Sequence, residues 1–131
     1  MMTAIGKVKK VDKEWGYELW LANNEEENYC GKILYVKSGH SSSMHYHAKK
    51  HETFYVLEGT LNVELIDTDT TEKTILTLEV GDTYVIDRHK PHRLFPSDTS
   101  DGVKFIEIST LHEDSDSYRV YREPVKEFST T

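Results

Sequence analysis

The chain has 131 residues, a hydrophobic fraction of 37% and a formal net charge of −7, which suits one globular domain with a real core. An acidic chain without a basic stripe argues against binding to nucleic acid or to an anionic membrane. No apolar run approaches ~18 residues, the first residues lack the apolar core of a signal peptide, and Cys30 is the single cysteine, so we expect a soluble cytoplasmic protein without disulfides.

Short β-type runs separated by turn signals follow one another along the chain, and no segment shows helical periodicity. Two of them, 53–57 and 61–66, are joined through Gly59 as a tight hairpin. The runs are 33–36, 53–57, 61–66, 74–78, 83–86, 92–95 and 103–109, with 118–122 as a candidate outer strand. Eight or more short strands at this spacing predict an all-β fold, a double-sheet jelly roll.

The same pattern predicts one domain. No linker rich in proline or glycine interrupts residues 1–131, so we expect a single unit with a core over about 15–122. The polar segment 124–131 is predicted to be a tail at the surface.

The richest segment lies between Gly39 and Gly59. His45 and His47 are two apart, so on a strand their side chains project to the same side. Glu52 has the wrong parity for that strand, and we expect the chain to turn and bring it back on a neighbouring strand. With His92, three imidazoles and one carboxylate suit a divalent ion such as Zn, Mn, Fe, Ni or Co. The alternative is a buried set of histidines paired to the carboxylate without a metal.

These residues resemble the two conserved motifs of the cupin superfamily. The first motif is matched without a gap as Gly-x5-His-x-His-x4-Glu-x6-Gly over 39–59, and the second opens at Gly81-Asp82 and ends at His92. Asp87 and His89 depart from the second motif, where proline and glycine are common. The resemblance implies a cupin jelly roll (double-stranded β-helix) with His45, His47, Glu52 and His92 as the metal ligands.

The ends of the chain are similar to the cupin domain of type II mannose-6-phosphate isomerases. The similar features are the aromatic-Gly-x-Glu entry at 15–18, the Ile-Glu strand ending at 109 and the acidic run 112–119. This resemblance implies an enzyme, an aldose–ketose isomerase of a sugar or sugar phosphate working through a metal-stabilised enediolate. Two alternatives stay open: an Fe(II)-dependent cupin dioxygenase, and a non-catalytic cupin that binds a small molecule such as a sugar.

Glu107 and Lys50 are the candidate catalytic residues. Glu107 alternates in phase with Val103 and Phe105, which would turn it into the interior as a general base; the alternative is a glutamate on the solvent face. Lys50 could hold a phosphate together with Arg88, Lys90 and Arg93, or belong to a solvated loop.

The remaining expectations concern other histidines and assembly. His51 and His89 could line the pocket mouth or lie in solvated loops, and His40 and His112 are predicted at the surface. Small cupins commonly form homodimers, and the strand over 17–22 could add to a neighbour's sheet edge. The alternative is that this strand closes its own sheet.

Overall fold

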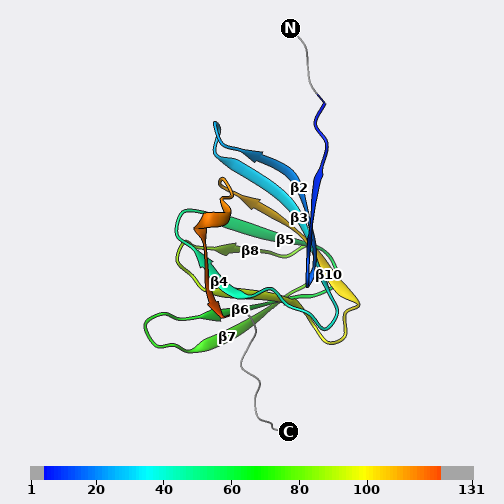
Figure 1. The fold of residues 1–131 in the computed structure, drawn as a ribbon. Helices are drawn as coiled ribbons and strands as arrows, with labels where there is room; N and C mark the ends of the chain where they lie inside the picture. Colours follow the sequence, from blue (N-terminus) through cyan, green and yellow to red (C-terminus); the bar gives the residue numbers. More distant parts are fainter. Residues whose placement is uncertain (1–4, 122–131) are drawn as a thin grey trace.

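The computed structural model describes residues 5–121 as two antiparallel sheets that face one another (Figure 1). One sheet has six strands in the order β1-β2-β3-β10-β5-β8, and the other has five in the order β11-β4-β9-β6-β7. The elements are β1 (Lys9–Lys13), β2 (Gly16–Asn24), β3 (Tyr29–Lys37), β4 (Met44–His47), β5 (Glu52–Glu58), β6 (Leu61–Ile66), β7 (Lys73–Leu78), β8 (Thr83–Ile86), β9 (His92–Pro96), β10 (Gly102–Ser109), the 3-10 turn η1 (Asp114–Asp116) and β11 (Ser117–Tyr121). The predicted jelly roll is confirmed.

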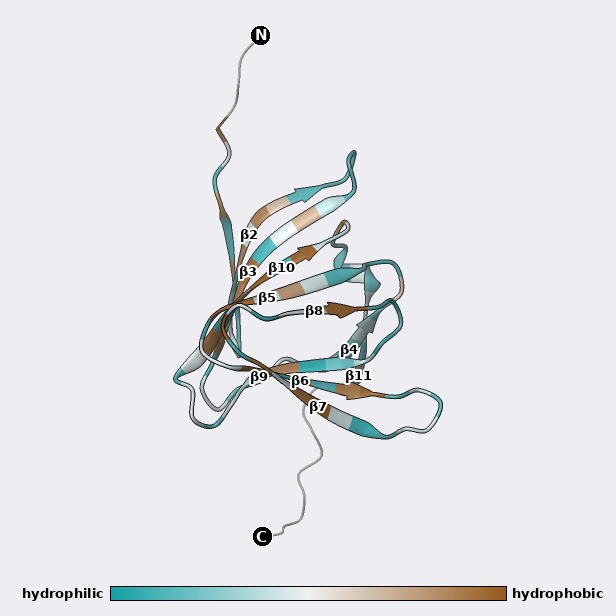
Figure 2. Ribbon diagram, turned by 180° about the vertical axis from the view of Figure 1, so that it is seen from behind, coloured by the Kyte–Doolittle hydropathy of each residue, from teal (hydrophilic) through white to brown (hydrophobic). Residues whose placement is uncertain are grey.

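Alternating side chains explain why these segments form strands around one core. In β3 every second residue from Cys30 to Val36 is buried, and in β10 the buried set runs from Val103 to Ser109. The inward side chains of both sheets meet in a single apolar cluster, and Figure 2 shows hydrophobic residues concentrated where the two sheets converge. The opposite ends of β4, β5 and β6 are more hydrophilic, and the polar residues discussed below come from that side.

The β5–β6 hairpin depends on Gly59. Its φ of 80° lies in the left-handed region, and a Cβ at this position would collide with the carbonyl oxygen of Gly102. Glycine is required there for both reasons. The tight turn sets the register of β6, which pairs with β9 and places Leu65 opposite His92.

One expectation about the N-terminal part needs correction. The strand predicted over 17–22 lies inside the sheet as part of β2, because it pairs with β1 on one side and β3 on the other. It therefore offers no free edge to a second copy, and the predicted route to a dimer is wrong. The sheet begins at Lys9, but β1 is mostly exposed, and the first residue packed against the apolar core is Trp15. Arg122 and the predicted tail 124–131 lie outside the described residues.

Over residues 5–121, no helix is long and apolar enough to cross a membrane.

The backbone of His89 adopts a conformation that favours glycine, the residue common at this position of the second motif. Its φ is 66°, a left-handed conformation that costs a non-glycine residue about 1 kcal/mol. Its N–H nevertheless donates to the carbonyl of His47 at 2.7 Å, which ties the loop before β9 to the end of β4.

We expect His89→Gly to raise the free energy of unfolding by about 0.5–1 kcal/mol, because glycine adopts this φ without steric cost. Urea denaturation of the variant and the parent protein measures the difference. His51→Gly, at a position without positive φ, is the control and is expected to destabilise. A destabilised His89→Gly protein would show that the imidazole contributes more than the strained backbone costs.

Candidate metal centre

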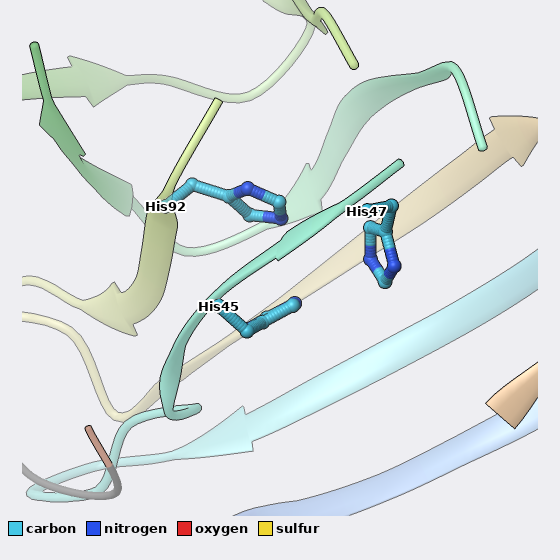
Figure 3. Close-up of side chains that lie close together, drawn as sticks. All are labelled: His45, His47 and His92. Carbon is cyan, nitrogen blue, oxygen red and sulfur yellow. The ribbon is translucent and has the colours of Figure 1, made fainter. Parts of the chain in front are cut away.

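Three histidines gather at one end of the space between the sheets. β4 supplies His45 and His47, β9 supplies His92, and His45 and His92 are directly opposite in the β4–β9 pairing. One ring nitrogen from each lies within 4.8 Å of the others, and Figure 3 shows the three rings turned toward a shared space. This group could hold a metal ion. His45 and His47 share a face as the spacing predicts.

The second ring nitrogen of each histidine is held by a backbone carbonyl. Nδ1 of His45 lies 2.8 Å from the Ser43 oxygen, Nδ1 of His47 lies 3.0 Å from the Asp116 oxygen, and Nδ1 of His92 lies 2.9 Å from the Lys90 oxygen. A carbonyl can only accept, so each Nδ1 carries the hydrogen and each Nε2 presents a lone pair. All three rings are therefore set as Nε2 ligands.

Glu52 reaches the same space from the facing sheet. It begins β5, whereas His47 ends β4 in the other sheet, so the expectation of a neighbouring strand is wrong. Its Oε2 lies 3.2 Å from Nε2 of His92 and 3.6 Å from Nε2 of His47. The group of ligand atoms within 4.8 Å of one another consists of the three histidines, and Glu52 contacts two of their rings.

The atoms that face one another here fit a bound cation. Oε2 of Glu52 and Nε2 of His92 are buried, and neither has a hydrogen-bond partner within the described residues. Two lone pairs at 3.2 Å repel unless a positive charge lies between them. In the metal-free alternative, Glu52 and His92 would be hydrogen-bonded to each other and both atoms would have a partner. The observed geometry therefore favours a bound metal.

Burial tunes these groups for ligation. Burial lowers the pKa of His45 well below its ordinary value, and the neighbouring His92 and His47 add to this. Burial also lowers the pKa of His47. For Glu52, burial raises the pKa but His92 and Lys50 outweigh it, and the pKa falls well below its usual range. His45 and His47 are therefore neutral and the Glu52 carboxylate is ionised near pH 7, as metal binding requires.

The buried charged side chains around the site carry a net charge of −2. Four carboxylates stand against two ammonium groups, which leaves two negative charges in a region shielded from water. The groups are Glu18, Glu52, Glu107, Asp116, Lys32 and Lys50. A divalent ion would neutralise this balance.

We expect a divalent ion to stabilise the fold. At a free concentration about 100 times its Kd, binding adds about 2.7 kcal/mol to the free energy of unfolding. Thermal denaturation with Mn²⁺, Fe²⁺, Co²⁺, Ni²⁺ or Zn²⁺, then with a chelator, measures the gain and its reversal. His92→Ala should abolish the gain, and His40→Ala, an exposed histidine outside the group, should keep it. An equal gain in His92→Ala would contradict this site.

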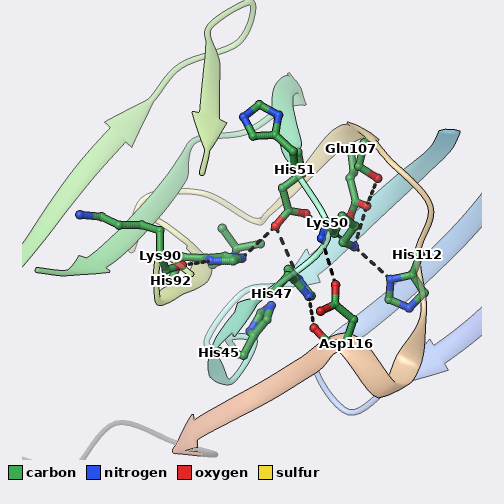
Figure 4. A network of polar contacts seen from close by, with 12 residues as sticks. His45, His47, Lys50, His51, Lys90, His92, Glu107, His112 and Asp116 are labelled. Carbon is green, nitrogen blue, oxygen red and sulfur yellow. Dashed lines mark hydrogen bonds and ion pairs between the residues drawn. The ribbon is translucent and has the colours of Figure 1, made fainter. Parts of the chain in front are cut away.

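The two predicted catalytic residues lie beside this centre. Nζ of Lys50 is 2.9 Å from Oε2 of Glu107, 3.0 Å from Nδ1 of His112 and 3.7 Å from Oε1 of Glu52 (Figure 4). Lys50 and Glu107 are each 3% exposed, so Glu107 points inward as its alternation predicts. Burial lowers the pKa of Lys50, but Glu107 and Glu52 outweigh it and raise that pKa, so the ammonium is retained.

His112 was expected at the surface, and this is wrong. Its side chain is 12% exposed, it accepts from Lys50 through Nδ1, and Nε2 lies 2.8 Å from Asp114. Burial and the nearby Lys50 lower the pKa of His112, so the ring is neutral. No local pattern marks it, because its partner Lys50 is 62 positions away.

Asp116, within the acidic run 112–119, supports the site although no local pattern marks it. Its buried carboxylate accepts from three consecutive backbone N–H groups, those of Ala48, Lys49 and Lys50, at 2.9 to 3.2 Å. Its own carbonyl accepts from His47. One residue of η1 thus fixes a histidine of the metal group and the turn that carries Lys50.

The basic residues expected to hold a phosphate have separate partners. Arg88 donates to the Lys49 carbonyl on the surface, and Arg93 pairs with Glu64 at 2.8 Å and stacks on Phe95. Lys50 is buried, and its ammonium donates to Glu107. His51 pairs with Asp87 in an exposed contact, and His89 is exposed. No shared phosphate site is visible among these described residues.

The polar groups line one cavity of about 1040 Å³ between the sheets. Its wall includes the three histidines, Glu52, Lys50 and Glu107 at one end. Glu18 of β2 and Ser117 and Arg119 of β11 also line this cavity. A small polar organic molecule fits in this space beside the metal group.

Comparisons with known proteins give a family and a fold. A family model described as a cupin domain matches residues 32–109, and no curated protein matches the chain. Oxalate decarboxylase from Bacillus subtilis at pH 4.6 is similar with a TM-score of 0.74 and 17% identity, over 86% of this chain and 30% of that one. The capsular polysaccharide assembling protein CapF from Staphylococcus aureus is similar with a TM-score of 0.76 and 14% identity, over 89% and 33%. The chain spans about a third of either structure, and at these identities the likeness shows the fold alone.

Proposed function

The chain belongs to the cupin domain family, and on this premise we propose that it is a metal-dependent aldose–ketose isomerase acting on a sugar or sugar phosphate. The observation that carries the proposal is the buried Lys50–Glu107 pair beside Glu52. It supplies a carboxylate base and a positive charge next to a group of metal ligands. These are the parts needed to move a proton between two adjacent carbons of a hydroxy-carbonyl compound.

In this proposal the metal is held by Nε2 of three histidines and by Glu52. The histidines are His45, His47 and His92, whose Nδ1 hydrogens are already used by backbone carbonyls. When bound, a divalent ion supplies Lewis acidity to neighbouring carbonyl and hydroxyl oxygens and so acidifies the intervening C–H. Glu52 is a ligand here and is not the base.

Glu107 is proposed as the base through its Oε1 atom. Its Oε2 accepts from both Lys50, at 2.9 Å, and Ser109, at 2.8 Å. Oε1 has no hydrogen-bond partner within the described residues and is not among the fully buried unsatisfied atoms. This oxygen can take the proton from one carbon and return it to the next, through an enediolate of the substrate.

Lys50 contributes charge at the point where the enediolate forms. Its ammonium lies between Glu107 and Glu52, and it is 3% exposed, so its field is weakly screened by water. Glu107 and His112 accept hydrogen bonds from Nζ, and the Glu52 carboxylate lies 3.7 Å away, so the ammonium is held in one orientation. A fixed positive charge in this place stabilises negative charge that develops on a substrate oxygen.

Solvent deuterium exchange tests the proposal. The metal-loaded protein is incubated without oxygen in deuterium oxide with a panel of aldoses and their phosphate esters, and NMR follows carbons 1 and 2. We expect ketose formation with deuterium at these carbons. Oxygen uptake on a non-sugar substrate, with no exchange on any sugar, would replace this function by an Fe(II) dioxygenase. Sugar binding without exchange would make the chain a binding module.

A further inference from the structure

A second buried ion pair lies on the cavity wall away from the histidines. Lys32 on β3 is directly opposite Glu107 in the β3–β10 pairing, and Glu18 lies on the next strand, β2. Figure 1 shows β2, β3 and β10 side by side in the six-stranded sheet. Lys32 is 1% exposed and Glu18 9%, and both line the cavity. The proposed reaction uses neither residue.

The pair leaves hydrogen-bonding capacity unused. Oε1 of Glu18 accepts from Nε1 of Trp20 at 2.8 Å and from Nζ of Lys32 at 3.3 Å. Oε2 of Glu18 has no partner within the described residues and is not fully buried. Lys32 has three N–H donors, of which Glu18 takes one, and its ammonium also lies 4.3 Å from the centre of the Trp20 ring. One acceptor oxygen and two donors remain at the cavity wall.

The fold itself does not require this pair. A buried ion pair contributes little net stability compared with apolar side chains of similar size. The adjacent inward positions of β3 and β10 are Leu34 and Phe105, which belong to the apolar core. The pair lines a cavity although apolar side chains would stabilise the fold at least as well. A free donor and a free acceptor in this wall therefore indicate a ligand that bonds to both.

We propose that Glu18 and Lys32 form a subsite for the hydroxyl groups of an uncharged, polyhydroxylated chain. This inference rests on the proposed function and narrows its substrate class. A hydroxyl both donates and accepts, so it suits the Glu18 oxygen and the Lys32 ammonium together. A phosphate only accepts at its charged oxygens and would be repelled by Glu18. The whole lining holds seven carboxylates, Asp12, Glu14 and Asp114 among them, against five lysine and arginine side chains, and this excess of negative charge opposes a dianion.

The position of the subsite in the sheet determines which carbons of the substrate it contacts. β3, β10 and β5 are consecutive in the sheet, so Lys32 stands two strands, about 10 Å, from the strand that carries Glu52. Carbons held near the metal group and Glu107 lie at one end of the cavity. Lys32 is opposite Glu107, and Glu18 lies one strand farther from Glu52, so the pair contacts hydroxyls on the carbons that follow the reacting pair on the Glu107 side.

Binding of unreactive polyols tests the subsite without any turnover. The probes are a hexitol such as mannitol, the three-carbon glycerol and a hexitol phosphate, titrated by calorimetry into the metal-loaded protein. We expect mannitol to bind at least about tenfold more tightly than glycerol and than the phosphate ester, because only mannitol reaches the subsite without repulsion. Tighter binding of the phosphate ester, or no binding of mannitol, would overturn the proposal.

A double variant adds a residue-level test. Glu18→Gln with Lys32→Met removes both charges together, so neither is left unpaired. We expect it to bind mannitol and glycerol equally weakly. The matched control is Glu58→Gln with Lys104→Met, a pair at 3.3 Å outside this cavity, which should keep the preference. A folded double variant that keeps the preference for mannitol would overturn the subsite.

The outcomes separate this inference from the proposed function. Suppose that no sugar exchanges deuterium, but that mannitol binds the parent protein and not the double variant. The isomerase proposal then fails and the subsite stands. If sugars exchange and the double variant leaves both mannitol affinity and KM unchanged, the subsite fails and the isomerase proposal stands.

Discussion

Glu107→Gln is expected to slow deuterium exchange and isomerisation by about 10²–10⁴-fold, the usual contribution of a general base. The amide has nearly the same shape as the carboxylate but cannot take a proton at the position of Oε1. Lys50 keeps Glu52 and His112 as partners, so we expect the variant to fold. Exchange rates from NMR, with metal content measured on the same sample, test the expectation.

The metal measurement makes this result interpretable. Glu107 does not belong to the histidine group, so metal content should stay that of the parent protein while the rate falls. Glu72→Gln, on the exposed loop before β7, is the matched control and should leave both quantities unchanged. Normal exchange in Glu107→Gln would remove this residue from the reaction. If metal content fell together with the exchange rate, Glu107 would have a structural role in the metal site and would not be identified as the base.

Asp116→Ala is expected to lower the free energy of unfolding by about 3–5 kcal/mol, because three backbone N–H groups, one buried and two partly buried, lose a charged acceptor. The turn at 48–50 and the carbonyl that orients His47 move with it. Disturbing such supporting groups typically costs about 10–100-fold in metal affinity. Urea denaturation and metal titration measure the two effects separately.

Two further variants decide what the Asp116 carboxylate contributes. Asp116→Asn keeps one acceptor oxygen, so its loss of stability should be smaller than that of alanine. Asp69→Ala, in the exposed loop 67–72, is the control and should change neither stability nor metal affinity. If Asp116→Ala binds metal as tightly as the parent protein, then Asp116 supports the fold alone and not the histidine group.

Much of the site follows from local pattern. A spacing of two puts His45 and His47 on one face of any strand, and the same periodicity turns Glu107 inward with Phe105. Turn residues predict the β5–β6 hairpin. The family motifs add His92, because they carry information on which distant residues meet. The metal group and the candidate base were predictable for these reasons.

The errors arise where long-range pairing decides. Arg93 lines the cavity and pairs with Glu64 from a neighbouring strand, a partner that the local pattern does not reveal. His112 was expected outside, but the segment after β10 folds over Lys50. The strand over 17–22 was expected at an edge, but β1 covers it. None of these partners is close enough in sequence to leave a local signal.

The amino-acid sequence by itself determined the alternating strands, their turns and the residue types able to bind a metal, because these depend on neighbours a few positions apart. The tertiary structure alone decided that Glu52 faces the histidines from the opposite sheet, that Asp116 holds the turn at 48–50, and that Glu18 and Lys32 share the cavity wall with Glu107. Those contacts join residues 14 to more than 60 positions apart. They exist because the two sheets pack face to face, which no periodicity within one strand can specify.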